Sequence, residues 1–115
     1  MKVLVIDDSK LARSAIINLV KQTVPKATFA EAEDGDIALR MIGEDNYDLY
    51  TIDYTMPGAN GEIVALAALT ASPRAKICML TSATGGDMQA RCERIGVKFL
   101  SKENFESDLI SFITS

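Results

Sequence analysis

The stretch that decides the fold is residues 47–58, YDLYTIDYTMPG. Within it, residues 49–52 form a short apolar run rich in β-forming side chains, which is typical of a buried strand. Asp53 follows this run directly and precedes the turn residues Pro57 and Gly58, so it is expected at the carboxyl end of the strand. Ligands of open parallel α/β sheets bind outside the carboxyl ends of the strands, which makes Asp53 a candidate site residue. Taken alone, however, Asp53 is better explained as a turn residue.

Similar apolar runs recur along the chain and alternate with segments of helical periodicity. The sequence predicts strands at residues 2–6, 27–32, 48–52, 76–80 and 97–100, and helices at residues 10–24, 37–43, 62–71, 87–95 and 105–113. Strands that alternate with helices need crossover connections, which give a parallel sheet covered on both faces. The predicted fold is therefore α/β, a doubly wound five-stranded parallel sheet with five helices, in one domain of residues 1–115.

The composition excludes several classes of function. A net charge of −4 argues against binding to nucleic acid, which requires a basic face. No apolar run is long enough to span a membrane, and Asp7 and Asp8 interrupt the first run too early for a signal peptide, so a cytoplasmic protein without membrane contact is expected. The absence of histidine excludes Ser-His-Asp and Cys-His catalysis, histidine zinc sites and a role as phosphohistidine carrier. Cys78 and Cys92 lie among apolar neighbours and are expected to be free, buried thiols.

Polar side chains follow four of the five predicted strands. They are Asp7 and Asp8, Asp53, Thr81 and Ser82, and Lys102. If the fold gathers these strand ends, the carboxylates repel one another unless a cation lies among them. Because ligands that are all oxygen suit a hard divalent ion, the sequence predicts a Mg²⁺ site.

The same residues suit a phosphoryl group. Lys102 can pair with one phosphate oxygen, and the hydroxyl of Thr81 or Ser82 can donate to another. Asp53 is ionised at neutral pH and can act as a nucleophile without a general base. Each residue also has an ordinary explanation, the acids and hydroxyls as turn residues and Lys102 as a surface lysine. That such explanations all hold at four parallel strand ends together is much less expected.

Several motifs, in this order and spacing, make the chain resemble the receiver domain of two-component response regulators. They are VLVIDDS at 3–9, AEDGDIAL at 32–39, YDL at 47–49, DYTMPG at 53–58 with Gly61, LTSA at 80–83, and Lys102. The resemblance covers the whole chain and is greatest to the stand-alone, CheY-like type. It implies a flavodoxin-like strand order of 2-1-3-4-5. It also implies a phosphoacceptor switch rather than an enzyme, apart from catalysis of its own phosphorylation and slow dephosphorylation.

The resemblance also implies a role for each acid. Asp53 would take a phosphoryl group from a phosphohistidine on a sensor histidine kinase or a histidine phosphotransfer protein. Asp8, Asp53 and the backbone carbonyl of Thr55 would bind Mg²⁺, or Mn²⁺ as an alternative, directly. Asp7 would reach the ion through a water molecule.

Thr81 and Lys102 would contact the phosphate, and Thr81 would couple phosphorylation to Phe99. When Thr81 moves toward the phosphate, Phe99 can turn inward and alter the face formed by the fourth helix, fifth strand and fifth helix, which an unidentified downstream protein would read. Gly85 and Gly86 make the intervening loop easy to move. On burial alone, Phe99 is explained equally well as an ordinary core aromatic.

Three departures from the family pattern have consequences. Phe99 stands where the chemotaxis type carries Tyr, and without a hydroxyl it cannot donate a hydrogen bond to a partner, which argues against binding to a flagellar motor. Glu103 follows Lys102 where the family usually has proline in a cis peptide bond, and a cis bond before another residue costs about 2.5–4 kcal/mol, so a trans bond or a strained loop is expected. Thr55 and Ala83 flank the acyl phosphate and are expected to set its lifetime.

Competing functions fit the sequence less well. A haloacid-dehalogenase-like phosphatase needs a second acid two residues after its nucleophile, but Thr55 and Ser9 stand there after Asp53 and Asp7. A nucleotide-binding module is unsupported because no Gly-x-Gly-x-x-Gly or Walker loop follows a strand. A receiver-fold interaction module that works without phosphorylation is the remaining alternative.

Overall fold

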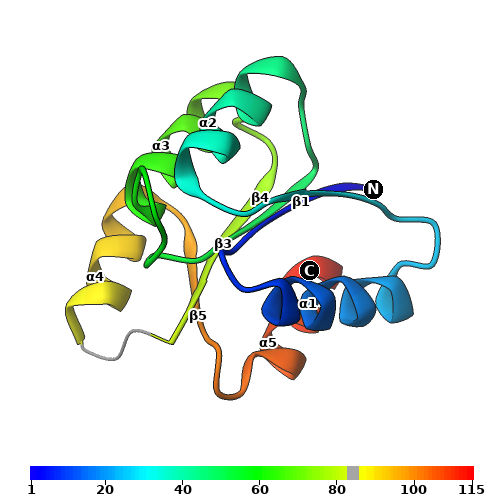
Figure 1. Ribbon diagram of the computed structural model, residues 1–115. Helices are drawn as coiled ribbons and strands as arrows, with labels where there is room; N and C mark the ends of the chain where they lie inside the picture. Colours follow the sequence, from blue (N-terminus) through cyan, green and yellow to red (C-terminus); the bar gives the residue numbers. More distant parts are fainter. Residues whose placement is uncertain (83–85) are drawn as a thin grey trace.

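The computed structural model describes residues 1–82 and 86–115, which form five strands and five helices in alternation (Figure 1). The strands are β1 (Lys2–Ile6), β2 (Thr28–Ala32), β3 (Leu49–Ile52), β4 (Lys76–Thr81) and β5 (Lys98–Ser101). The helices are α1 (Lys10–Thr23), α2 (Gly35–Glu44), α3 (Gly61–Ala71), α4 (Gly86–Ile95) and α5 (Phe105–Thr114). All neighbouring strands are parallel, in the order β2-β1-β3-β4-β5. The predicted fold class and strand order are confirmed, and the predicted bounds of each element differ from those observed by at most two residues.

Two layers of helices cover the sheet. Figure 1 shows α1 and α5 on one side and α2, α3 and α4 on the other. Alternate side chains of β1 enter the two layers, Val3 and Val5 toward α1 and α5, Leu4 and Ile6 toward α2 and α3. Because both faces of the strand are buried, its sequence is a continuous apolar run rather than an alternating one.

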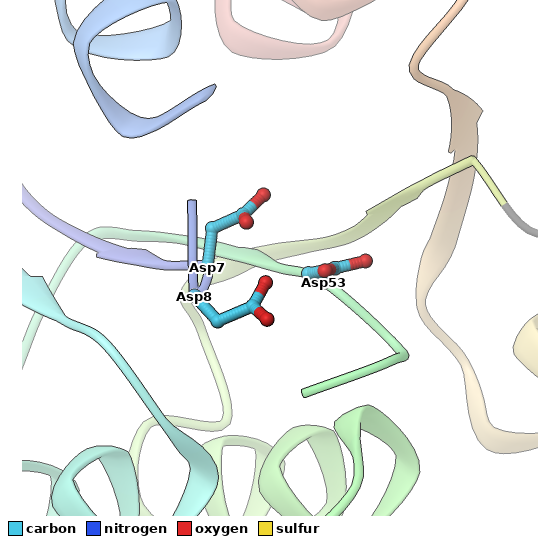
Figure 2. Close-up of side chains that lie close together, drawn as sticks. All are labelled: Asp7, Asp8 and Asp53. Atoms are coloured by element: carbon cyan, nitrogen blue, oxygen red, sulfur yellow. The ribbon is translucent and has the colours of Figure 1, made fainter. Parts of the chain in front are cut away.

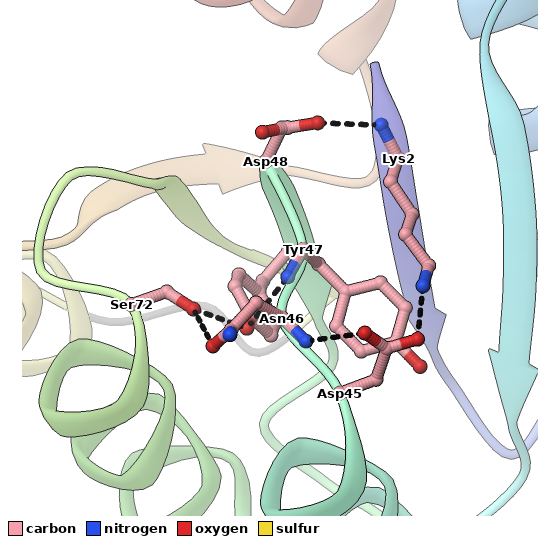
Figure 3. Close-up of polar contacts among 7 residues, drawn as sticks. Lys2, Asp45, Asn46, Tyr47, Asp48 and Ser72 are labelled. Carbon is pink, nitrogen blue, oxygen red and sulfur yellow. Dashed lines mark hydrogen bonds and ion pairs between the residues drawn. The ribbon is translucent and has the colours of Figure 1, made fainter.

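The amino end of the sheet is closed by polar contacts (Figure 3). The buried Tyr50 hydroxyl lies 2.9 Å from Ser72 Oγ, and Ser72 in turn donates to Asn46 Oδ1 at 3.3 Å. The Lys2 backbone N–H donates to Asp48 Oδ2 at 2.7 Å. These bonds join the end of α3 and the loop before β3 to the start of the sheet. The polar groups named here therefore have hydrogen-bond partners within the fold.

Both cysteines are free and buried, as expected. Burial raises the pKa of the Cys78 thiol to about 12, which keeps that group neutral. Within the described parts of the chain, no helix has the length and apolar character needed to cross a membrane.

Candidate metal centre

Three carboxylates converge at the carboxyl end of the sheet, as the sequence predicts. Asp7 and Asp8 follow β1, and Asp53 follows β3, the neighbouring strand. One oxygen atom from each residue lies within 4.8 Å of the others. Figure 2 shows the carboxyl groups of Asp7 and Asp8 turned to the side on which Asp53 lies. Such a group of oxygen ligands suits a hard divalent cation.

The sheet hydrogen bonds hold the backbone of two of these acids. The Asp7 N–H donates to the Ala32 carbonyl at 3.1 Å, and the Asp53 N–H donates to the Ile6 carbonyl at 2.9 Å. The parallel pairing therefore continues one residue past the strand ends. The apolar runs of β1 and β3 therefore determine where the backbone of Asp7 and Asp53 lies. From there the two side chains project into the same space.

Lys102 supplies the positive charge of the site. Its Nζ lies 2.7 Å from Asp7 Oδ2 and 3.5 Å from Asp53 Oδ2. Burial lowers the pKa of Lys102, but the hydrogen bond to Asp7 and the charges of Asp53 and Asp7 outweigh this and hold the pKa above its ordinary value. The peptide bond between Lys102 and Glu103 is trans, as expected, because no cis bond occurs in the described chain.

Asp53 occupies a buried and negatively charged environment, with 5% of the residue exposed. Desolvation, followed by the charge of Asp7, raises the pKa of Asp53 above its ordinary value. Lys102, a hydrogen bond with the Thr81 side chain and the Thr55 backbone partly offset that increase. A divalent cation beside Asp53 would relieve the same repulsion and favour the ionised carboxylate.

Asp7 has a different set of contacts. Its Oδ1 accepts a hydrogen bond from the Ser9 N–H at 2.9 Å. Its Oδ2 is buried and faces Lys102 Nζ at 2.7 Å, and within residues 1–82 and 86–115 no other group donates a hydrogen bond to it. A buried carboxylate oxygen with spare lone pairs fits a site that takes up a hydrated cation.

The hydroxyl and aromatic candidates lie on one face of the sheet. Thr81 is buried at the end of β4 and its side chain forms a hydrogen bond with Asp53, whereas Ser82 is exposed, so Thr81 is the hydroxyl that reaches the site. Thr81 pairs with Ser101, and Phe99 lies two residues before Ser101 on β5. Side chains two apart share a face, and half-buried Phe99 packs on the core under α2, α3 and α4. Ala83, Thr84 and Gly85 lie outside the described residues.

The loop after Asp53 is tightly seated, a feature that the sequence analysis did not identify. Gly58 has φ +76°, in the left-handed region that glycine readily adopts. Asp36 Oδ1 accepts a hydrogen bond from the Ala59 N–H at 3.2 Å. A Cβ on Gly61 would lie 2.6 Å from the Asp53 carbonyl oxygen. The loop that carries Thr55 is thus closely packed at both ends. In the sequence, Gly58 and Gly61 were the residues that could have indicated this close packing.

Arg13 is a second neighbour that the sequence analysis did not identify. Its Nη1 donates to the Asp7 backbone carbonyl at 2.6 Å, and its Nε lies 2.8 Å from Glu31 Oε1. No periodic signal in the sequence marks Arg13, because its partners come from the end of β1 and from β2.

Comparisons with known proteins agree with this geometry. The family model described as response regulator receiver domain matches residues 3–114. The chain is 36% identical over 100 residues to the chemotaxis protein CheY of Pseudomonas aeruginosa, covering 84% of this chain and 79% of that protein. It is 32% identical over 111 residues to CheY of Listeria monocytogenes, covering 96% and 92%. A chain of the CheX–CheY–BeF3–Mg²⁺ complex from Borrelia burgdorferi matches with a TM-score of 0.85 at 20% identity, covering 98% and 86%, which is a likeness of fold.

Proposed function

The chain belongs to the response regulator receiver domain family, as a CheY-type phosphoacceptor of two-component signalling, and on this premise we propose that Asp53 is the residue that is phosphorylated. The convergence of Asp7, Asp8 and Asp53 within 4.8 Å is the observation that carries the proposal. Asp53 also has Lys102 and the Thr81 side chain beside it. Asp7 is less suited to attack, because one of its oxygens accepts a backbone hydrogen bond and the other contacts Lys102.

The proposed reaction is transfer from a phosphohistidine on a sensor histidine kinase or a histidine phosphotransfer protein. An Asp53 carboxylate oxygen attacks phosphorus, the P–N bond breaks, and its electron pair returns to the imidazole. Asp53 is the nucleophile and the chain needs no histidine of its own, which agrees with the composition. Transfer of this kind depends mainly on positioning and on neutralising the phosphoryl charge.

The acidic site fits Mg²⁺, or Mn²⁺ as an alternative. Asp8, Asp53 and the backbone carbonyl of Thr55 would bind the ion directly, and Asp7 would bind it through water. The exposure of Asp8 and the spare lone pairs of Asp7 Oδ2 support this division, since Mg²⁺ usually keeps several waters. The bound ion would neutralise charge on the attacking and transferring oxygens.

Lys102 and Thr81 would then contact the phosphoryl oxygens. Lys102 Nζ already lies 3.5 Å from Asp53 Oδ2, so a small movement would bring the ammonium to an oxygen of the new group. Thr81 would give its hydroxyl to another oxygen. These two contacts would be made only after transfer begins, which is the condition for lowering the barrier rather than merely binding the donor.

Phosphorylation would reach the output face through Thr81 and Phe99. They lie on the same face of adjacent parallel strands, with Phe99 two residues before the partner of Thr81, so they are diagonal neighbours on that face. If Thr81 shifts toward phosphate, the space beside it favours an inward Phe99. The face formed by α4, β5 and α5 would change as a result and regulate a downstream protein.

A groove beside the site would seat the phosphodonor protein. It has a volume of about 360 Å³ and runs between α1 and α5, with Leu11, Ala15 and Phe105 on its walls and Lys102 at its edge. Leu11 is 82% exposed. The groove is lined by apolar side chains and includes Lys102, so it adjoins the atoms that must meet phosphohistidine, which is where a donor protein would dock.

Intact mass measurement tests the proposal. The protein is incubated with MgCl₂ and acetyl phosphate, beside Asp53→Asn and an EDTA-treated sample. The parent should gain the mass of one phosphoryl group, whereas neither Asp53→Asn nor the EDTA-treated sample should gain mass. No gain in the parent would contradict the proposal and favour an interaction module that works without phosphorylation. A gain that persists in Asp53→Asn would assign the acceptor to another residue.

A further inference from the structure

Arg13 is held in a fixed position by two partners. Its guanidinium donates from Nη1 to the Asp7 carbonyl at 2.6 Å and from Nε to Glu31 on β2 at 2.8 Å. The Arg13 side chain is 11% exposed, whereas Glu31 is 46% exposed, so the bond to the Asp7 carbonyl is the more shielded of the two. Arginine offers several donors in a rigid planar fork, which allows one side chain to join a helix, a strand and a strand end.

The carbonyl that Arg13 holds belongs to the peptide unit between Asp7 and Asp8. This unit is planar, so its orientation fixes the N–Cα bond of Asp8, about which the Asp8 side chain is placed. On the other side of Asp7, the N–H is held by Ala32, and the Asp7 side chain is held by Ser9. Asp8 itself lies on the exposed rim of the site. The bond from Arg13 is therefore the contact best placed to aim Asp8.

We propose that Arg13, oriented by Glu31, is a positioning residue that fixes the Asp7–Asp8 peptide and thereby aims the Asp8 carboxylate at the divalent cation. This inference rests on the metal site proposed above and adds a residue to it. Arg13 acts through the backbone and makes no contact with the ion. Groups that orient metal ligands typically change metal affinity by 10–100-fold when they are removed.

The positive charge of Arg13 and its positioning of Asp8 have opposite effects on the affinity for Mg²⁺. A cation near the site repels Mg²⁺, so an arginine that acted only through charge would weaken metal binding. Removing such a charge would tighten binding, whereas removing a positioning residue would weaken it. The sign of the change therefore separates the two roles.

The test is a calorimetric titration of the full chain with MgCl₂ at constant ionic strength. Arg13→Met keeps the aliphatic stem and removes the donors, and we expect it to weaken Mg²⁺ binding about tenfold. Arg13→Lys keeps the charge and one donor group, so its Mg²⁺ affinity should lie between that of Arg13→Met and that of the parent. Arg40→Met is the control, because it removes a charge from a pair with Glu44 in which both side chains are 68% exposed, and its Mg²⁺ affinity should equal that of the parent.

Glu31→Gln tests whether Glu31 works through Arg13. It should weaken Mg²⁺ binding in the parent but have no further effect in Arg13→Met. Additive effects in the double variant would contradict the link between the two residues. A second readout uses the metal-free protein, in which amide hydrogen exchange of Asp8 and Ser9 should accelerate in Arg13→Met and stay unchanged in Arg40→Met.

The outcomes separate this inference from the metal site itself. If the parent binds Mg²⁺ and Arg13→Met binds it equally well or more tightly, only the positioning role fails. Unchanged exchange at Asp8 would overturn it as well. If the parent binds no Mg²⁺, the proposed metal site fails, and the positioning role fails with it.

Discussion

The Lys102 ammonium lies 2.7 Å from Asp7 Oδ2, so the cation of the site is paired most closely with an acid that is not the proposed phosphoacceptor. Its distance to Asp53 Oδ2 is longer, at 3.5 Å. Lys102 thus balances a cluster of negative charge in the same region that a divalent ion would occupy. An ion and a phosphoryl group would affect this lysine in opposite directions, since the first repels it and the second attracts it.

Lys102→Met is therefore expected to tighten Mg²⁺ binding by about threefold to tenfold, because a competing positive charge is removed. Phosphorylation by acetyl phosphate should slow by about 100-fold, because an electrostatic donor to the phosphoryl group is lost. Calorimetry and a mass-spectrometric time course measure the two effects. Lys98→Met removes an exposed charge four residues earlier and should change neither. Weaker Mg²⁺ binding in Lys102→Met would mean that the main role of Lys102 is to hold the carboxylates of Asp7 and Asp53 in position for the ion.

Asp53→Asn should stabilise the metal-free protein at neutral pH. Desolvation and the charge of Asp7 raise the folded-state pKa of Asp53, so the ionised form lowers stability at pH 7, and this loss is relieved as pH falls through the folded-state pKa. The melting temperature should rise by about 3 °C at pH 7. This gain in melting temperature should vanish below pH 3.8, the ordinary pKa of aspartate, where Asp53 is protonated in both the folded and the unfolded state.

Thermal unfolding in EDTA across this pH range measures the effect. Asp108→Asn, which removes the same charge from an exposed position on α5, should show no comparable gain. A lower melting temperature for Asp53→Asn at pH 7 would mean that the attraction between Asp53 and Lys102 outweighs the cost of burial.

The parts of the site that local sequence determines were predictable. An apolar run followed by acids defines β1 with Asp7 and Asp8, and a similar run defines β3 with Asp53. Parallel pairing then brings the ends of neighbouring strands together, which needs no knowledge of side-chain packing. The acidic cluster could therefore be predicted from strand pattern and topology alone.

The remaining contacts depend on packing between distant elements. Whether Arg13 reaches the Asp7 carbonyl depends on the rotation of α1 and on Glu31 of an edge strand, 18 residues away. The choice of Thr81 over Ser82 depends on β4 continuing one residue beyond its apolar run, to Thr81. Neither feature has a periodic sequence signal, so neither could be resolved before the structure was known.

Leu11→Ala should separate protein donors from small donors. If the groove between α1 and α5 seats a phosphodonor protein, loss of this 82% exposed side chain removes apolar contact from that interface. Transfer from a phosphorylated histidine phosphotransfer domain that phosphorylates the parent should fall about tenfold. The rate with acetyl phosphate should not change.

Ile63→Ala is the matched control for this experiment, because Ile63 is 50% exposed on α3, across the sheet from the groove. Equal losses in Leu11→Ala and Ile63→Ala, or a loss with acetyl phosphate, would argue against docking at the groove.

Thr81→Ala should uncouple the acidic site from the output face. Beryllofluoride with Mg²⁺ imitates a phosphoryl group, and in the parent it should shift the amide resonances of the site and of β5 and α5. Without the Thr81 hydroxyl, beryllofluoride affinity should fall about tenfold. At saturation the shifts should remain near Asp53 and be lost around Phe99. Thr70→Ala removes an exposed hydroxyl from α3 and should behave as the parent. Full shifts at Phe99 in Thr81→Ala would exclude this route.

Gly61→Ala tests how firmly the loop after Asp53 is seated. The added Cβ would lie 2.6 Å from both the Asp53 carbonyl oxygen and Tyr54 Cα, and backbone atoms cannot move aside as a flexible side chain can. We expect a loss of about 1–3 kcal/mol in the free energy of unfolding, together with weaker Mg²⁺ binding as Asp53 is displaced. Gly43→Ala is the matched control, since no atom lies within 4 Å of its new Cβ, and this helix position should gain about 0.5 kcal/mol. Urea unfolding and Mg²⁺ titration measure both variants. If Gly61→Ala loses stability but keeps the Mg²⁺ affinity of the parent, the loop can shift without moving the Asp53 carboxylate.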